Sequence, residues 1–138
     1  MSTARRNGLM LVWLVLLGGL LCACGAPAPP APAPARPMPR MGQAVDGEAI
    51  WYGEMFHGRA TASGEAFDQH GLTAAHASLP LGAVVEVTSI TTGKSVEVRI
   101  NDRGHLGAGN DLALSRGAAE ALGVFPVRRF AVQYRWVR

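Results

Sequence analysis

Three titratable side chains stand out in the sequence as groups that could transfer protons: Glu65, His76 and Asp102. Carboxyl and imidazole groups are the usual general acids and bases of enzymes, so this trio could protonate a leaving group and later accept a proton. Each residue also has a purely structural interpretation. A glutamate beside a glycine is most often solvated surface, a lone histidine is more often a structural hydrogen-bonding group, and Asp102 followed by Arg103 is typical of a turn with a local ion pair. The residue types alone leave both interpretations open.

Other site chemistries have less support in the sequence. The histidines lack the paired spacing that a zinc site needs, so we expect no metal. They are His57, His70, His76 and His105. We also expect no cofactor, because the sequence shows no glycine-rich phosphate loop. The net charge of +3 falls to +1, with 11 basic against 10 acidic residues, once Arg5 and Arg6 of the N-terminal segment are left out. A nucleic-acid partner is not expected, because phosphate binding needs a clustered basic face.

The elements that must position these side chains are mostly short strands. Residues 83–90 and 95–102 alternate between apolar and polar side chains, and a four-residue turn separates them. This pattern predicts a β-hairpin. In the second run Val96, Val98 and Ile100 share one face, so the opposite face is polar.

One helix and two further strands complete the expected folded region. Ser115 can N-cap a helix over residues 116–122, with Gly123 as its C-terminal stop. Residues 129–137 alternate like the hairpin, and residues 47–56 are typical of a strand that ends in a glycine turn. Several short strands with one short helix predict a mainly β fold, a small barrel.

The N-terminal segment is typical of an export signal. Two arginines precede an uncharged apolar run over residues 8–23, which is short for a membrane-spanning helix. A leucine three residues before Cys24 and an alanine directly before it resemble the bacterial lipobox. We therefore predict a signal peptide over residues 1–23 and lipidation of Cys24. Cys22 fits the cleavage site less well.

Residues 24–44 combine the predicted lipidation site with a run rich in proline and alanine. Seven of the nine prolines lie within residues 27–39. Proline fixes φ and lacks an N–H donor, so we predict an extended tether without a packing role, followed by one domain over residues 45–138. Gly25 rather than aspartate follows Cys24. We therefore expect a lipid-anchored protein on the periplasmic face of the outer membrane.

The predicted domain resembles the rare lipoprotein A family. The similarity rests on three stretches with the family's order and spacing of WYG, GRATASGE, LTAAH, LPLG and NDRG. They are residues 49–68, residues 72–104 and, more weakly, residues 111–123. The resemblance implies a six-stranded double-psi β-barrel with one or two short helices, related to expansins and barwin.

The resemblance also implies an activity and a substrate. Studied members of the family are endolytic lytic transglycosylases, which cleave peptidoglycan glycan strands between N-acetylmuramic acid and N-acetylglucosamine and leave a 1,6-anhydro ring. Larger members carry a SPOR domain that recognises stripped glycan at division sites. We expect neither that domain nor septal targeting here, and we expect a monomer.

The resemblance places Glu65, His76 and Asp102 in one polar active-site cluster. We expect Asp102 to be the principal acid and base with the other two assisting, and an exchange of roles between Glu65 and Asp102 is the alternative. Burial of Glu65 against Trp51 or Tyr52 would raise its pKa and make it an acid. Both aromatic rings could stack on sugar or belong to the core. The expected substrate-binding residues are Trp51, Tyr52, Arg59, Thr61, Ser63 and Arg103.

The sequence departs from the family pattern near this cluster. His105 and Leu106 replace Pro and Phe, Asn110 replaces Arg, and Ala113 replaces Asp. Asp111 is the nearest substitute, but a shift of two residues along a strand moves a carboxyl group by about 6–7 Å. Two other hypotheses therefore stay open: a non-catalytic, expansin-like module that binds glycan or loosens the wall, and a structural envelope lipoprotein.

Overall fold

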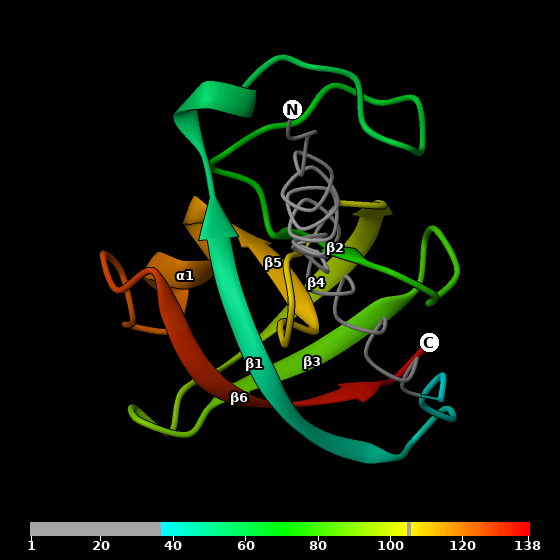
Figure 1. The fold of residues 1–138 in the computed structure, drawn as a ribbon, viewed down its shortest axis with the longest axis vertical. Coiled ribbons are helices and arrows are strands. Elements are labelled where there is room, and N and C mark those ends of the chain that lie inside the picture. The colour runs from blue at the N-terminus through cyan, green and yellow to red at the C-terminus, as the bar shows by residue number, and fades with distance from the viewer. Residues whose placement is uncertain (1–36, 105) are drawn as a thin grey trace, which may run out of the picture. The chain divides into compact units, whose positions relative to one another are not determined.

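Six strands form one closed barrel in the computed structural model, which describes residues 37–104 and 106–138 (Figure 1). The order around the barrel is β1-β5-β2-β4-β3-β6. The strands are β1 (Ala44–Tyr52), β2 (Thr73–His76), β3 (Val84–Ser89), β4 (Ser95–Asp102), β5 (Leu112–Ser115) and β6 (Arg129–Trp136). The pairs β1–β5 and β2–β4 are parallel and the other four pairs are antiparallel. The mainly β, six-stranded prediction is confirmed.

The predicted hairpin and the predicted C-terminal strand are both present. β3 and β4 pair antiparallel, with Val85 opposite Val98. In β6, Phe130, Val132 and Tyr134 are buried, and the residues between them are more exposed. Because side chains alternate across a strand, one face of each strand lines the barrel interior and the other faces outward.

The described residues form two short helices, and one or two were expected. α1 (Arg116–Ala121) begins after Ser115, whose Oγ accepts the Ala118 N–H at 3.3 Å. The helix stops at Gly123, whose φ of +71° suits glycine. The 3-10 helix η1 (Glu54–Phe56) lies in the connection between β1 and β2, which Figure 1 shows at one end of the barrel.

Two apolar clusters lie on opposite sides of the sheet. The larger one, here called the interior cluster, fills the barrel, with Ala74, Val85 and Ile100 among its residues. The smaller one, here called the outer cluster, consists of Ala75, Leu106 and Ala113 with Ile50 and Tyr52 packed against it. Residues next to one another in sequence, such as Ala74 and Ala75, thus belong to different clusters, as strand alternation requires.

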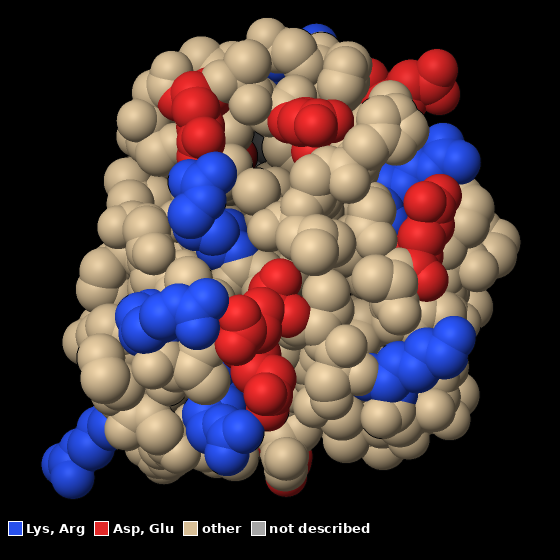
Figure 2. Space-filling model, turned by 180° about the vertical axis from the view of Figure 1, so that it is seen from behind, with Lys and Arg blue, Asp and Glu red and all other residues tan. Residues whose placement is uncertain are grey.

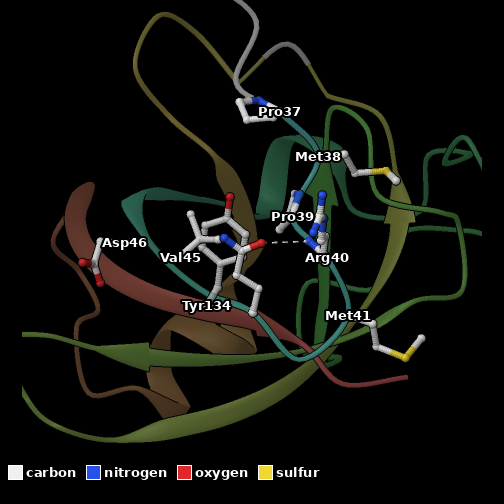
Figure 3. A pocket seen from close by; sticks show the side chains of 9 residues that line it. Pro37, Met38, Pro39, Arg40, Met41, Val45, Asp46 and Tyr134 are labelled. Atoms are coloured by element: carbon white, nitrogen blue, oxygen red, sulfur yellow. Dashed lines mark hydrogen bonds between the residues drawn. The ribbon is translucent and has the colours of Figure 1, made fainter.

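The first described residues contact the barrel. Pro39 is buried, and the Gly42 N–H donates to the Trp136 carbonyl at 2.8 Å. Residues 37–41 line an open pocket together with Val45, Asp46 and Tyr134 (Figure 3). The end of the predicted tether therefore packs on the domain. The predicted signal peptide, Cys24 and tether residues 25–36 lie outside the described residues.

Charged side chains of both signs are interspersed on the face shown in Figure 2. Ion pairs between strands include Arg135 with Glu86 at 2.7 Å, and Arg138 at the chain end pairs with Glu97 at 3.0 Å. Within the described part of the chain, no helix has the length and apolar character needed to cross a membrane.

Candidate functional site

A row of four residues crosses the outer face of the sheet next to the candidate acid. Ile50 of β1 lies opposite Ala113 of β5, Ala113 lies opposite Ala75 of β2, and Ala75 lies opposite Asp102 of β4. Neighbouring strands are about 4.8 Å apart, so Ala113 and Asp102 are separated by roughly 10 Å across β2. The family's aspartate at position 113 would therefore stand on the same face as Asp102.

Asp102 is held by backbone amides at the end of β4. Its Oδ1 accepts the Ala62 N–H at 3.0 Å and the Arg103 N–H at 2.8 Å. The neighbouring Ser63 N–H donates to the Asn101 carbonyl at 3.0 Å. These contacts dock the loop Thr61–Glu65 onto the end of β4. The structure thus brings the Glu65 loop and Asp102 together.

The Glu65 carboxylate, however, faces Arg99 and not an aromatic ring. Arg99 Nη1 and Nη2 donate to its two oxygens at 2.5 and 3.1 Å, and Ser63 Oγ donates to Oε1 at 3.1 Å. The hydrogen bonds from Arg99, with those from the Asn101 and Ser63 side chains, lower the pKa of Glu65 to about 2. The expectation that burial raises this pKa is wrong, because 40% of the side chain is exposed and a cation is bound to it.

His76 lies inside the barrel wall with 5% of its surface exposed. Its Nδ1 accepts the N–H groups of Ser78 and Leu79 at 3.1 and 3.0 Å, and its ring centroid lies 5.9 Å from that of Tyr134. Burial lowers the pKa of His76, with a smaller lowering by Arg103 and an opposing effect of Asp111. Since Nδ1 accepts two hydrogen bonds, the neutral ring carries its proton on Nε2.

The two aromatic residues expected at the site lie on different faces of β1. Trp51 packs against the interior cluster, with its ring 4.9 Å from that of Phe125. Tyr52 points outward, where it stacks on Phe67 at 4.4 Å and meets Phe56 edge-on at 5.7 Å. Burial, and then the Asp102 carboxylate, raise the pKa of Tyr52 above its ordinary value. Tyr52 is therefore the one of the two rings that lies beside Asp102.

The remaining predicted binding residues are Thr61 and Ser63 of the loop Thr61–Glu65, Arg59 just before it and Arg103 after β4. Thr61 Oγ1 contacts Ser63 Oγ at 2.9 Å and donates to the Glu65 carbonyl at 2.9 Å. The Arg59 guanidinium lies 5.6 Å from the Phe56 ring centroid. Arg103 Nη1 donates to the His76 carbonyl at 3.0 Å, which links the ends of β4 and β2.

Sequence reasoning missed Arg99, Asn101 and Phe56. Arg99 and Asn101 share the polar face of the 95–102 run, but alternation does not say which residue they meet. Arg99 reaches Glu65 across 34 positions of the chain. Phe56, 45% exposed and beside Tyr52, is an aromatic surface that the WYG motif did not indicate.

Asp111 does not occupy the place of the missing aspartate. Its Oδ2 accepts the Glu48 N–H at 3.0 Å, and its own N–H donates to the Glu48 carbonyl at 2.8 Å. A Cβ at Gly47 would lie 2.3 Å from this Oδ2, so the close approach requires glycine there. Asp111 thus binds the backbone of β1, while Ala113 is buried in the outer cluster.

Comparison with known proteins finds a matching family and similar sequences. A family model described as lytic transglycolase matches residues 44–134. "Probable endolytic peptidoglycan transglycosylase RlpA" of Synechocystis is 56% identical over 78 residues, which are 56% of this chain and 24% of that protein. "Endolytic peptidoglycan transglycosylase RlpA" of Pseudomonas aeruginosa is 53% identical over 77 residues, 56% of this chain and 23% of that protein. The chain therefore spans about a quarter of the length of these relatives.

A solved structure confirms the predicted type of barrel. The expansin of Clavibacter michiganensis superposes with a TM-score of 0.57 and 25% identity, over 70% of this chain and 51% of that one. The double-psi β-barrel prediction is thus confirmed. The family match covers most of the barrel, from β1 into β6, and includes the loop Thr61–Glu65 and Asp102. This chain belongs to the lytic transglycolase family of double-psi β-barrel proteins.

Proposed function

We propose that the barrel is a lytic transglycosylase that cleaves peptidoglycan glycan strands between N-acetylmuramic acid and N-acetylglucosamine and leaves a 1,6-anhydro product. The single observation that carries this proposal is the setting of Asp102. Two backbone N–H groups donate to its Oδ1, beside an outward-facing aromatic layer of Tyr52 and Phe67. The names of the relatives support the choice of substrate.

The reaction needs one carboxyl group that first gives and then takes a proton. Asp102, protonated on Oδ2, donates its proton to the glycosidic oxygen as the bond to the muramic C1 breaks. The C6 hydroxyl of the same sugar attacks C1, the new C1–O6 bond forms, and the hydroxyl proton passes to Asp102. No water is consumed, and the attack within one sugar benefits from high effective molarity. The oxocarbenium-like transition state is cationic, so nearby carboxylates stabilise it.

The other predicted site residues support this step. Glu65 and His76 assist Asp102, and Tyr52, Arg59, Thr61, Ser63 and Arg103 are proposed to bind or position the glycan. Trp51, which packs against the barrel core, takes the core role that the sequence had left open. Ring stacking by an exposed aromatic residue and hydrogen bonds from arginine are the contacts that a sugar chain with amide substituents accepts. No metal or cofactor takes part in this scheme.

The test is incubation of the full chain with purified peptidoglycan sacculi, with anhydro-muropeptides measured by mass spectrometry. Wild type should release them, and Asp102→Asn should release none while still sedimenting with sacculi. Release by Asp102→Asn at the wild-type rate would refute the assignment of Asp102.

The second candidate function is a non-catalytic glycan-binding or wall-loosening module. Ala113 favours it, because the family's aspartate is absent from the row that contains Asp102. The structural likeness to an expansin is consistent with it. Binding of wild type to sacculi without any anhydro product would select this function over the first.

We also propose that lipidation of Cys24 anchors the chain to the membrane, on the periplasmic face of the outer membrane, and that the protein is a monomer. The lipobox-like sequence before Cys24 and the glycine after it support this placement. Several acyl chains on one cysteine bind a membrane stably, which a single chain does not.

A further inference from the structure

The protein itself occupies most of the hydrogen-bonding capacity of the Glu65 carboxylate. Arg99 donates one hydrogen bond to each oxygen, and Ser63 Oγ donates a third, to Oε1. An ionised carboxylate has about four lone-pair sites, so these donors use three of them. A carboxylate in this state is poorly placed to exchange protons with a substrate or to accept a hydrogen bond from it.

The same contacts fasten the loop Thr61–Glu65 to the outer face of β4. Arg99 and Asn101 belong to β4, whereas Ser63 and Glu65 belong to the loop. Within the loop, the Thr61 N–H and Oγ1 both donate to the Glu65 carbonyl, at 2.8 and 2.9 Å. The Glu65 side chain therefore ties a closed turn to the strand that ends in Asp102, beside the hydrogen bond from the Ser63 N–H to the Asn101 carbonyl.

The fastened loop delivers a donor to the proposed acid. Ala62 lies in the middle of the loop, and its N–H reaches Asp102 Oδ1 at 3.0 Å across 40 positions of the chain. Arg103 supplies the second donor to the same oxygen from the adjacent peptide. With both donors on Oδ1, a proton on Asp102 is carried by Oδ2.

We propose that Glu65 is a positioning residue and not an acid or base: through its ion pair with Arg99 it fixes the Ala62 N–H against Oδ1 of Asp102, which commits Oδ2 to proton transfer. This inference rests on the proposed function of Asp102. It makes Arg99 necessary for turnover, although the Arg99 side chain binds Glu65 and not Asp102. The low pKa of Glu65 agrees with a group that stays ionised throughout the reaction.

An exchange of charges distinguishes positioning from direct catalysis. Glu65→Gln and Arg99→Met should each lower kcat by about 100-fold, the usual consequence of a misplaced catalytic group, and leave KM within about twofold. The double variant Glu65→Arg with Arg99→Glu, here called the charge-swap variant, should recover at least about tenfold of the lost turnover, because the ion pair forms again with its charges reversed. Glu86→Gln, which breaks the ion pair with Arg135, is the matched control and should keep wild-type turnover.

Two kinetic outcomes would overturn the inference. One is wild-type turnover by Arg99→Met. The other is a charge-swap variant that is as inactive as Glu65→Gln although its Ala62 amide is protected from hydrogen exchange as in wild type. Glu65 would then act on the substrate itself.

Amide hydrogen exchange tests the positioning separately from activity. The Ala62 amide should exchange at least about tenfold faster in Glu65→Gln and in Arg99→Met than in wild type, because its opening becomes easier. In the charge-swap variant, the exchange rate of the Ala62 amide should return toward the wild-type rate. Unchanged Ala62 exchange in both single variants would overturn the proposed link. If wild type releases no anhydro product, only the proposed function is refuted. The amide hydrogen-exchange rates would still decide what holds Ala62.

Discussion

At the scale of single residues, His76 shows how burial changes the role of a side chain. Two backbone amides occupy its Nδ1, and its ring lies against Tyr134 of the interior cluster. The ring caps the turn after β2, and the backbone carbonyl of His76 accepts a hydrogen bond from Arg103 Nη1. His76 is thus suited to holding the end of β2 in place next to Asp102.

The lowered pKa of His76 predicts how stability depends on pH. In the unfolded chain the ring titrates near its ordinary value of about 6.5, and in the folded protein burial shifts the titration lower. Between these values the unfolded state binds more protons, so the free energy of unfolding falls as pH drops below about 6.5. His76→Asn keeps an acceptor for the two amides and cannot titrate.

Urea unfolding at pH 7.5 and pH 5.5 measures this effect. Wild type should lose more stability between the two pH values than His76→Asn does. His57 and His70 are present in both proteins and cancel in the comparison. An equal loss in both proteins would show that His76 does not carry the pH dependence.

At the scale of elements, Ser115 joins β5, α1 and β2. Its Oγ accepts the Ala118 N–H at 3.3 Å and the Thr73 N–H at 3.4 Å, and it donates to the Gly71 carbonyl at 2.5 Å. The sequence predicted only the helix cap, because a capping serine is a local signal. The bonds to Thr73 and Gly71 cross more than 40 positions and depend on the closed barrel.

Ser115→Ala should therefore cost more than the loss of an ordinary helix cap. The variant leaves several buried backbone groups without their partner, and we expect the free energy of unfolding to fall by about 1–3 kcal/mol. Chemical denaturation monitored by tryptophan fluorescence measures it. Ser95→Ala removes an exposed contact with Thr88 and is the control, with an expected change within about 0.5 kcal/mol. Equal effects of the two variants would contradict the proposed role of Ser115.

At the scale of the whole molecule, the barrel brings the site together from distant parts of the chain. The loop after η1 supplies Glu65 and the Ala62 amide, and the hairpin β3–β4 supplies Arg99 and Asp102. Residues 37–43, at the end of the predicted tether, also contact the barrel.

The anchor proposal predicts where the chain is found after cell fractionation. Wild type should partition with membranes, and Cys24→Ala should move almost entirely to the soluble periplasmic fraction, because the acyl chains are absent. Cys22→Ala is the matched control and should stay with membranes. Membrane association of Cys24→Ala equal to that of wild type would contradict lipidation at this residue.

The sequence by itself determined four strands, β1, β3, β4 and β6, together with the hairpin and the capped helix α1, because strand alternation and helix caps are signals of a few adjacent residues. The resemblance to a known family added the barrel type and the site candidates. Only the tertiary structure decided that Glu65 meets Arg99 rather than Trp51 or Tyr52, and that His76 points inward. Alternation predicts that a residue faces one side of a sheet, but its partner there depends on barrel closure, which joins residues 34 to 40 positions apart.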